Sequence, residues 1–230
     1  MIKAKFIERK NRFTGIVELA DSQIVPVHIA NSGRLRELFE PGSEVHLIRQ
    51  DGAHRLTQYD LALVKYKERF VSVDARVPNE VVSKAIATSE LKEFAGLQMV
   101  RREVKFGDSR LDILLDDSQG NMCYVEVKSC TLVVGDTAKF PDAPTERGTR
   151  HLTELARAIK EGHRAAVVFL VQRDDAVRFA PNDDTDPVFG QTLREVVDRG
   201  VEVYAYICEV TPHHIGIVKS IPVELAACEY

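Results

Sequence analysis

Short stretches of alternating apolar and polar residues dominate the first third of the chain. Six of them, separated by turn residues, follow one another at 2–7, 13–19, 24–29, 44–48, 57–64 and 70–73. Such alternation predicts short β-strands with one buried face. One helical stretch is expected at 34–39, before the Pro41-Gly42 turn. This arrangement is typical of a small closed or nearly closed barrel of the OB type, a fold that often binds oligonucleotides.

The spacing of apolar residues changes to a helical period after residue 76. A helix is expected from 77 to 95 with Gly96 as its cap, then strands at 99–106, 111–115 and 122–129. A helix at 145–161, a strand at 165–171, a helix at 189–198 and a strand at 201–207 follow. Strand 165–171 is entirely apolar and must be covered on both faces, so we expect an α/β mixed sheet flanked by helices.

The predicted boundary between two domains lies at residues 74–79, around Pro78, which divides the chain into 1–75 and 76–230. The segment 183–187, Asp-Asp-Thr-Asp-Pro, is expected to be an exposed loop. We find no internal repeat and no tract of low complexity.

Composition narrows the class of protein. The chain has 230 residues, 44% of them hydrophobic and 29% charged, which favours a sizeable core over disorder or a coiled coil. The longest apolar runs are far shorter than a membrane-spanning helix, and Met1 leads directly into a strand pattern, so we expect a cytoplasmic protein with no membrane partner. The cysteines, at 123, 130, 208 and 228, form no CxxC pair and are expected to be reduced core thiols.

Charge is unevenly distributed along the chain, whose net charge is −4. Residues 1–75 hold 12 Lys and Arg against 10 Asp and Glu, whereas residues 76–230 hold 19 against 25. A polyanion would therefore meet the first part more easily, although ordinary surface scatter explains the imbalance equally well. In that part Arg9, Arg12, Asn31 and Arg34 are candidates for weakly sequence-specific phosphate contacts, and Phe13 is expected in the core.

Common catalytic signatures are missing from the sequence. It contains no GxxxxGK[ST] phosphate loop, no GxGxxG, no GxSxG and no HExxH. The adjacent pair His213-His214 is expected in an exposed loop rather than at a metal, because neighbouring residues of a strand point to opposite faces.

The stretch from 111 to 128 is the most informative one. Residues 116–121 have turn composition, so the strands on either side predict an antiparallel hairpin centred near 119. In that register Asp112 and Glu126 lie directly opposite each other, with Cβ atoms roughly 4.5 to 5.5 Å apart. Lys128 lies on the same face, two residues along the strand.

Two facing carboxylates repel each other unless a cation neutralises them. Mg²⁺ or Mn²⁺ suits such a pair, and with a phosphodiester bound the ion would polarise the phosphoryl group while Lys128 assists. Asp112, Glu126 and Lys128 then match the D-x(n)-(D/E)-x-K pattern of metal-dependent nucleases. A bare E-x-K also describes a solvated strand face with a favourable Glu/Lys pair, so the pattern alone leaves both interpretations open.

Several short blocks, taken in order, resemble one known family. They are residues 5–13 ending in Asn11-Arg12-Phe13, Asn31-Ser32-Gly33-Arg34-Leu35, Pro41-Gly42, Ser109-Arg110-Leu111-Asp112, Val125-Glu126-Val127-Lys128-Ser129, Phe140-Pro141-Asp142-Ala143, and Thr145-Glu146-Arg147-Gly148 followed by His151-Leu152 and Glu154-Leu155. Together they resemble the sugar fermentation stimulation protein A family over nearly the whole chain. The resemblance implies an OB-like domain joined to a PD-(D/E)xK nuclease-like domain, in a bacterial and archaeal cytoplasmic family described as DNA-binding and linked to expression of sugar-utilisation genes.

Two positions depart from the pattern that the resemblance implies. Leu111 replaces the usual Pro before the Asp, which affects only the entry of the strand. Lys84 stands on the first helix where many nucleases of this superfamily carry an acidic residue. The remaining candidates for a third metal ligand are Glu80, Glu90, Glu93 and Glu103.

Three polar residues of the helix at 145–161 are spaced i, i+4, i+7 and share one face: Arg147, His151 and Glu154. The spacing alone is better described by a solvated face with an intrahelical charge network. The resemblance favours a group that faces the hairpin, with Arg147 suited to phosphate and His151 to hydrogen bonding or proton transfer.

The sequence therefore predicts a DNA-binding protein, with RNA as an alternative substrate, that carries a metal-dependent phosphodiesterase site. The competing hypothesis is a non-catalytic DNA-binding transcriptional regulator that retains a nuclease scaffold. A small-molecule phosphodiesterase is a third possibility. The first domain is expected to supply most of the nonspecific affinity.

Overall fold

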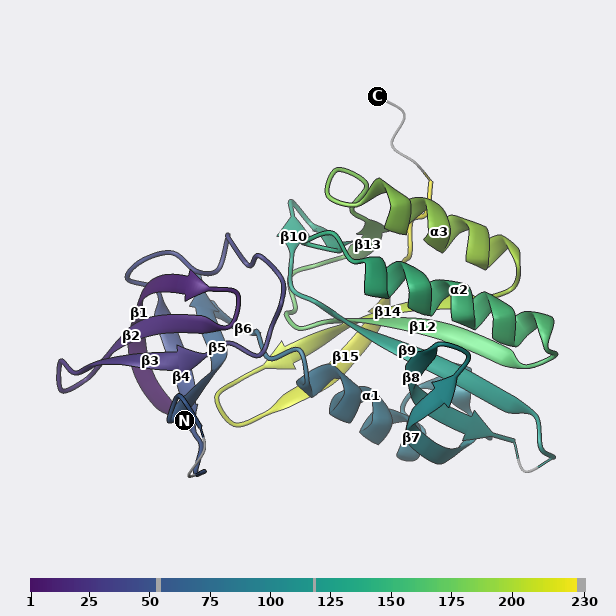
Figure 1. The fold of residues 1–230 in the computed structure, drawn as a ribbon, viewed down its shortest axis with the longest axis horizontal. Helices are drawn as coiled ribbons and strands as arrows, with labels where there is room; N and C mark the ends of the chain where they lie inside the picture. Colours follow the sequence, from purple (N-terminus) through teal and green to yellow (C-terminus); the bar gives the residue numbers. More distant parts are fainter. Residues whose placement is uncertain (53–54, 118, 227–230) are drawn as a thin grey trace.

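The computed structural model describes residues 1–52, 55–117 and 119–226, which form two parts that lie side by side (Figure 1). The first part contains β1 (Ile2–Asn11), β2 (Thr14–Leu19), β3 (Ile24–His28), β4 (Glu44–Arg49), β5 (Tyr59–Tyr66) and β6 (Arg69–Ser72). Its strand order is β3-β2-β1-β4-β5-β6, and a pairing of β3 with β5 closes the first five strands into a barrel.

Apolar residues at alternate positions fill the barrel. Phe6, Val17, Val27, Val45 and Val64 all point inward and are at most 2% exposed. The alternation that predicts the strands is therefore the pattern of the barrel interior, and the predicted OB-like architecture is confirmed.

The helix expected at 34–39 is wrong. This segment forms a turn, in which Leu35 has a φ of 51° and the amides of Leu38 and Phe39 both donate to the Leu35 carbonyl. The carbonyls of Gly33 and Arg34 accept from Arg9, and the amide of Leu35 donates to Asp142 at 3.1 Å. Because these backbone groups bond elsewhere, they are not available to a helix.

The second part is a six-stranded mixed sheet of order β15-β14-β12-β9-β8-β7. It comprises β7 (Gln98–Phe106), β8 (Ser109–Asp116), β9 (Met122–Cys130), β12 (Arg164–Val171), β14 (Glu202–Val210) and β15 (Ile215–Ile221). β9, β12 and β14 are parallel, whereas the outer strands pair antiparallel. A small sheet of β10 (Val133–Val134), β11 (Thr137–Phe140) and β13 (Arg178–Pro181) lies beside it.

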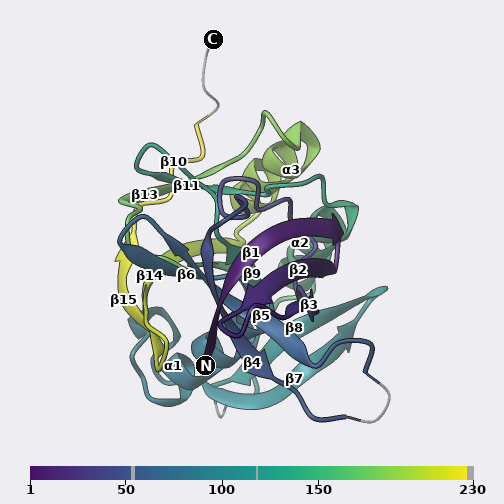
Figure 2. The same ribbon diagram turned by 90° about the vertical axis from the view of Figure 1, so that its left-hand side faces the viewer.

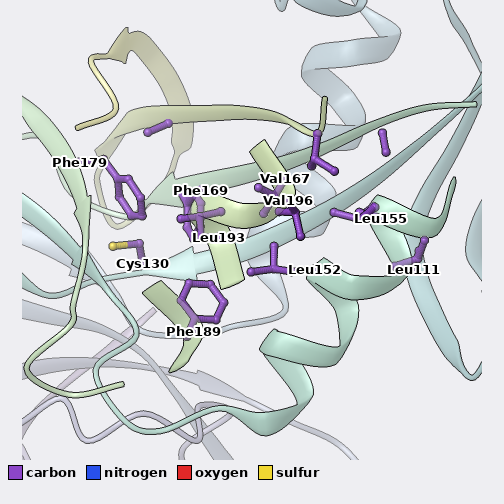
Figure 3. Packing of buried hydrophobic residues seen from close by; sticks show 14 of the residues in the cluster. Leu111, Cys130, Leu152, Leu155, Val167, Phe169, Phe179, Phe189, Leu193 and Val196 are labelled. Carbon is purple, nitrogen blue, oxygen red and sulfur yellow. The ribbon is translucent and has the colours of Figure 1, made fainter. Parts of the chain in front are cut away.

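Helices cover both faces of this sheet. α2 (Glu146–Lys160) and α3 (Pro187–Asp198) pack on one face, where Leu152 and Phe189 meet Val167 and Phe169 (Figure 3). α1 (Val77–Ala87) packs on the other, where Val82, Ala85 and Ile86 meet Ala166, Val168 and Leu170. Successive residues of β12 thus serve opposite cores, which confirms the prediction drawn from its apolar run. No helix in the described ranges has the length and apolar character to cross a bilayer.

The helix predicted from 77 to 95 is shorter in the structure. α1 ends at Ala87, and Ser89 takes a φ of 58° while the amide of Glu90 donates to the Ala85 carbonyl at 2.9 Å. This is the geometry of a Schellman C-cap, here without glycine. A separate 3₁₀ turn, η1 (Lys92–Phe94), follows, and Leu91 and Phe94 still reach the core, which is why their spacing resembled a continuous helix.

Several smaller expectations are also settled by the structure. Strands β10, β11, β13 and β15 were not predicted. Residues 183–186 form a loop and Pro187 already begins α3, but Asp186 is buried, with its carboxylate capping α3 at the Phe189 amide, 3.0 Å away. His213 and His214 are exposed in a loop as expected. Cys123, Cys130 and Cys208 are buried free thiols, and Cys228 lies outside the described residues.

Side-chain and backbone contacts join the two parts. Arg69 of β6 pairs with Asp174 at 2.6 Å, and the amide of Ser72 donates to the carbonyl of Gln172 at 3.1 Å. Arg173 is 2% exposed and lies over the Tyr66 ring, 4.9 Å from its centroid. Seen from the barrel side, β7 and β8 reach out beyond the barrel (Figure 2).

Candidate functional site

A cleft of about 630 Å³ lies where the barrel meets the β8–β9 hairpin. The barrel contributes the loop after β3 and the tip between β1 and β2, and the second part contributes α1, β7, β8, β9 and the segment before α2. Its charged and amide lining residues are Arg12, Asn31, Arg76, Asn79, Glu80, Arg102, Glu103, Asp112, Glu126, Lys128, Asp142 and Arg147. Residues that the sequence singled out from both domains thus line one cleft.

The hairpin has the predicted register. Ile113 pairs with Val125 and Leu115 with Cys123, and the same register places Asp112 opposite Glu126 just beyond the last pair. The Asp112 carboxylate accepts from the Val127 amide at 2.8 Å through Oδ2 and from Asn79 Nδ2 at 2.8 Å through Oδ1. The backbone of one strand therefore fixes the acid of the other.

Glu126 is the most deeply buried acid of the cleft, with 3% exposure. Its Oε1 accepts from Lys128 Nζ at 2.6 Å and makes a short contact with His151 Nδ1. Its Oε2 is buried and has no hydrogen-bond partner among the described residues. A buried carboxylate oxygen without a partner is costly unless a cation, a water molecule or a ligand completes it.

The two acids have different electrostatic environments. Burial, reinforced by repulsion from Glu126, raises the pKa of Asp112 to about 6, against the donors Val127 and Asn79 and the Lys128 charge. Burial also opposes ionisation of Glu126, but Lys128 and His151 outweigh it and hold the pKa of that carboxyl below its ordinary value. The pair therefore concentrates negative charge at a site with little water.

The carboxylate pair fits a hard divalent cation, and the unpartnered Glu126 Oε2 is the observation that supports the fit. Within the described ranges no three His, Cys, Asp or Glu side chains converge closely enough to hold an ion by themselves. An ion at Asp112 and Glu126 would therefore take its remaining ligands from backbone carbonyls, water or a substrate phosphate.

The structure separates the four candidates for a third acidic ligand. Glu80 and Glu103 line the cleft, while Glu90 and Glu93 are not among its lining residues. Glu103 has a φ of 54°. Lys84 is exposed on α1, so the departure at this position does not place a charge in the cleft.

α2 presents its three polar residues to three different places. Arg147 lines the cleft, His151 is buried against Glu126, and Glu154 accepts from the Asp108 amide at 3.2 Å at the β7–β8 turn. Thr145 starts the helix by accepting from the Gly148 amide at 3.0 Å. The three side chains therefore face the hairpins rather than forming a network with one another.

The four polar candidates of the barrel divide into two kinds. Arg9 donates to the carbonyls of Arg12, Asn31, Gly33 and Arg34 over 2.6 to 2.9 Å. Asn31 donates to the Val73 carbonyl and accepts from the Gly33 amide, so both residues hold the loop. Arg12 and Arg34 are exposed and open to a ligand.

The expectation that Phe13 lies in the core is wrong. It sits at the β1–β2 turn, is 47% exposed and lies 6.4 Å from the His28 ring. Asn79 was not singled out from the sequence, because nothing near it distinguishes it from any other residue in the first turn of a helix. Arg102 was missed for the same reason, since it is one cation among several on an exposed strand.

Comparison with known proteins agrees with these features. A family model described as the SfsA N-terminal OB domain matches residues 7–73, and one described as the sugar fermentation stimulation protein RE domain matches residues 76–214. Sugar fermentation stimulation protein homologs of Desulforamulus reducens and Thermoanaerobacter sp. X514 are 48% and 47% identical over 98% of this chain and 93% and 97% of theirs. A solved structure of Pyrococcus furiosus SfsA in complex with Ca²⁺ matches 97% of this chain and 95% of its own, with a TM-score of 0.90 and 32% identity. The chain belongs to the sugar fermentation stimulation protein (SfsA) family.

Proposed function

We propose that this protein binds nucleic acid in the interdomain cleft and hydrolyses phosphodiester bonds there with a divalent cation, Mg²⁺ or Mn²⁺, at Asp112 and Glu126. The observation that carries the proposal is the buried, unpartnered Oε2 of Glu126 beside a second carboxylate. The Ca²⁺ in the P. furiosus relative supports a hard cation, because Ca²⁺ and Mg²⁺ prefer the same oxygen ligands.

A bound divalent ion would polarise the phosphoryl oxygen and lower the pKa of the attacking water. The chain's own residues prepare the site for it. Lys128 and His151 both contact Glu126 Oε1, which fixes the rotation of that carboxylate and leaves Oε2 available. Asn79 and the Val127 amide orient Asp112 in the same way.

Positive charge along the cleft suits a phosphate backbone. Arg12, Arg102 and Arg147 line it, and none of them pairs with an acid among the described residues. Lys128 is the cation nearest to the carboxylates, since it bonds directly to Glu126. It is placed to offset negative charge that develops on a phosphodiester bound in the cleft.

A second candidate function is DNA binding without cleavage, as in a transcriptional regulator that uses the scaffold for its shape and charge. The observation that favours it is the absence of a third convergent acidic side chain among the described residues. Under this alternative the arginines of the cleft remain important, while Asp112 contributes only structure.

Cleavage assays decide between the two candidates. Labelled single- and double-stranded DNA and RNA are incubated with the protein and Mg²⁺ or Mn²⁺, and Asp112→Asn, Lys128→Met and the control Glu209→Gln are compared with the wild type. Glu209 is an exposed acid of β14 and is not among the residues that line the cleft. We expect cleavage to be lost in the first two variants and kept in the control. No cleavage by the wild-type protein, or equal cleavage by all four proteins, contradicts the phosphodiesterase assignment.

A further inference from the structure

The pairing of the arginines is unevenly distributed over the surface. Eleven of the nineteen form an ion pair with an acid or donate to backbone carbonyls within the protein, for example Arg164 with Glu202 and Arg178 with Asp136. Eight have no such partner among the described residues, and all eight are exposed. They are Arg12, Arg34, Arg36, Arg101, Arg102, Arg110, Arg147 and Arg150.

Five of the eight unpaired arginines line either the cleft or a groove that adjoins it. Arg12, Arg34 and Arg36 line a groove on the barrel, and this groove shares Arg12 with the cleft. Arg102 and Arg147 continue along the cleft on the side of the second domain. Arg110, with Lys105 opposite it, then extends the series onto the β7–β8 ribbon. Unpaired arginines from both parts of the chain therefore line the cleft that holds Asp112 and Glu126.

The backbone of β7 departs from regular strand geometry and lies at the edge of the sheet. A register shift between Met99 and Arg101 and the positive φ of Glu103 interrupt the normal alternation of β7. Arg101 pairs with Leu114 and Arg102 with Ile113 in continuous register, so these two neighbours lie on opposite faces of the ribbon, and both are exposed. β7 is also the edge strand of the sheet, so one side of its backbone has no neighbouring strand.

Two like charges face each other across this ribbon. Lys105 pairs in register with Arg110, and no acid among the described residues bonds to either of them. Like charges directly opposite on an antiparallel pair destabilise a sheet. A bound polyanion would remove that repulsion, so the arrangement suits a surface that works with a ligand.

The ribbon is held firmly against α2. Glu154 accepts from the Asp108 amide, and a Cβ at Gly107 would overlap the Glu154 carboxylate. Phe106 packs on Tyr124 with ring centroids 4.6 Å apart, and Arg157 covers the Phe106 ring at 5.8 Å. The exposed cations therefore stand on a supported ribbon.

We infer that the nucleic-acid backbone bound in the cleft continues onto the β7–β8 ribbon, so that Lys105 and Arg110, which lie opposite each other, form a phosphate-binding surface on the second domain. The inference rests on the proposed nucleic-acid binding and assigns part of the affinity to the more acidic half of the chain. Nucleic acid is the partner that fits, because it carries the regularly spaced phosphates that a line of unpaired arginines can follow.

The test is equilibrium binding of labelled duplex DNA in EDTA over a range of salt concentrations, so that neither metal nor cleavage enters. Lys105→Gln with Arg110→Gln is compared with Arg49→Gln with Arg199→Gln, which removes the same charge from two arginines that each lie near an acid. Each lost phosphate contact lowers the salt slope by about 0.9, or roughly eight-fold in affinity at 0.1 M salt. We expect a slope lower by about two units in the ribbon variant and a smaller change in the control.

The possible outcomes separate this inference from the proposed function. If the wild type binds and the two double variants bind equally well with equal slopes, the ribbon has no role and only this inference is overturned. If the wild type binds neither DNA nor RNA at low salt, both fail. Thermal unfolding of each variant confirms that a lost affinity does not arise from a lost fold.

Discussion

Substituting Arg9 by methionine should destabilise the barrel far more than its position near the surface suggests. Its guanidinium donates to four carbonyls and lies 5.3 Å from the Phe39 ring. These bonds join the β1–β2 turn at Arg12 to the loop that carries Asn31 and Gly33. Without them, the β1–β2 turn and this loop, which both line the cleft, are no longer held together by Arg9.

The size of the effect follows from the burial of each bond. The bonds to Gly33 and Asn31 are half-buried, and those to Arg34 and Arg12 are exposed. Charged hydrogen bonds are worth about 1.5 kcal/mol each at the low end when water cannot replace them, and exposed ones a few tenths. We therefore expect Arg9→Met to lower the free energy of unfolding by about 3 to 4 kcal/mol.

Urea denaturation followed by circular dichroism measures this difference. Arg36→Met is the matched control, since Arg36 is exposed on the same loop and makes no side-chain bond to a described residue. Its unfolding free energy should change by less than about 0.5 kcal/mol. A loss of less than about 1 kcal/mol in Arg9→Met, or equal losses in both variants, would refute the structural role of Arg9.

Two further predictions concern the domain junction and pH. Gly33→Ala places a Cβ 2.5 Å from the Asp142 carboxylate, so the hydrogen bond from the Leu35 amide to Asp142 should break and the thermal unfolding midpoint should fall. In the control Gly52→Ala the new Cβ meets only the flexible Arg55 side chain, so the midpoint should not change. Equal midpoints in the two variants would contradict this prediction. Burial of Glu202 opposes its ionisation, but its ion pair with Arg164 outweighs this and lowers the pKa of the carboxyl in the folded protein. The pair therefore stabilises the fold fully above the unfolded pKa of about 4.3, and this stabilisation is lost as the pH falls through the lower pKa of the folded state. Glu202→Gln should therefore be less stable than the wild type at pH 7, with a difference that narrows toward pH 3 in denaturation experiments, and a difference independent of pH would show that the pair contributes nothing electrostatic.

Local patterns predicted most of the strands and the hairpin register. Alternation works in the barrel because each strand has one face on the core, and the turn composition at 116–121 places Asp112 opposite Glu126 without knowledge of the rest of the fold. α2 was predictable because its apolar stripe and the Thr145 cap lie within a single stretch of sequence.

The missed features depend on contacts between distant segments. Residues 34–39 have helical spacing, but Arg9 and Asp142 bind their backbone. Asn79 reaches Asp112 across 33 positions of the sequence. The support that Arg9 gives to this loop depends on carbonyls that only the folded chain brings together. Such contacts leave no periodic signal in the sequence.

Titration with Mn²⁺, followed by the electron paramagnetic resonance signal of the free ion, tests the central claim most directly. The wild type, Asp112→Asn, Glu126→Gln and the control Glu209→Gln are compared at pH 7.5 under conditions where each remains folded. The account predicts that the wild type and the control deplete the free-ion signal equally, and that both cleft variants bind at least ten-fold more weakly. Equal binding by all four proteins would show that Asp112 and Glu126 do not hold a divalent cation.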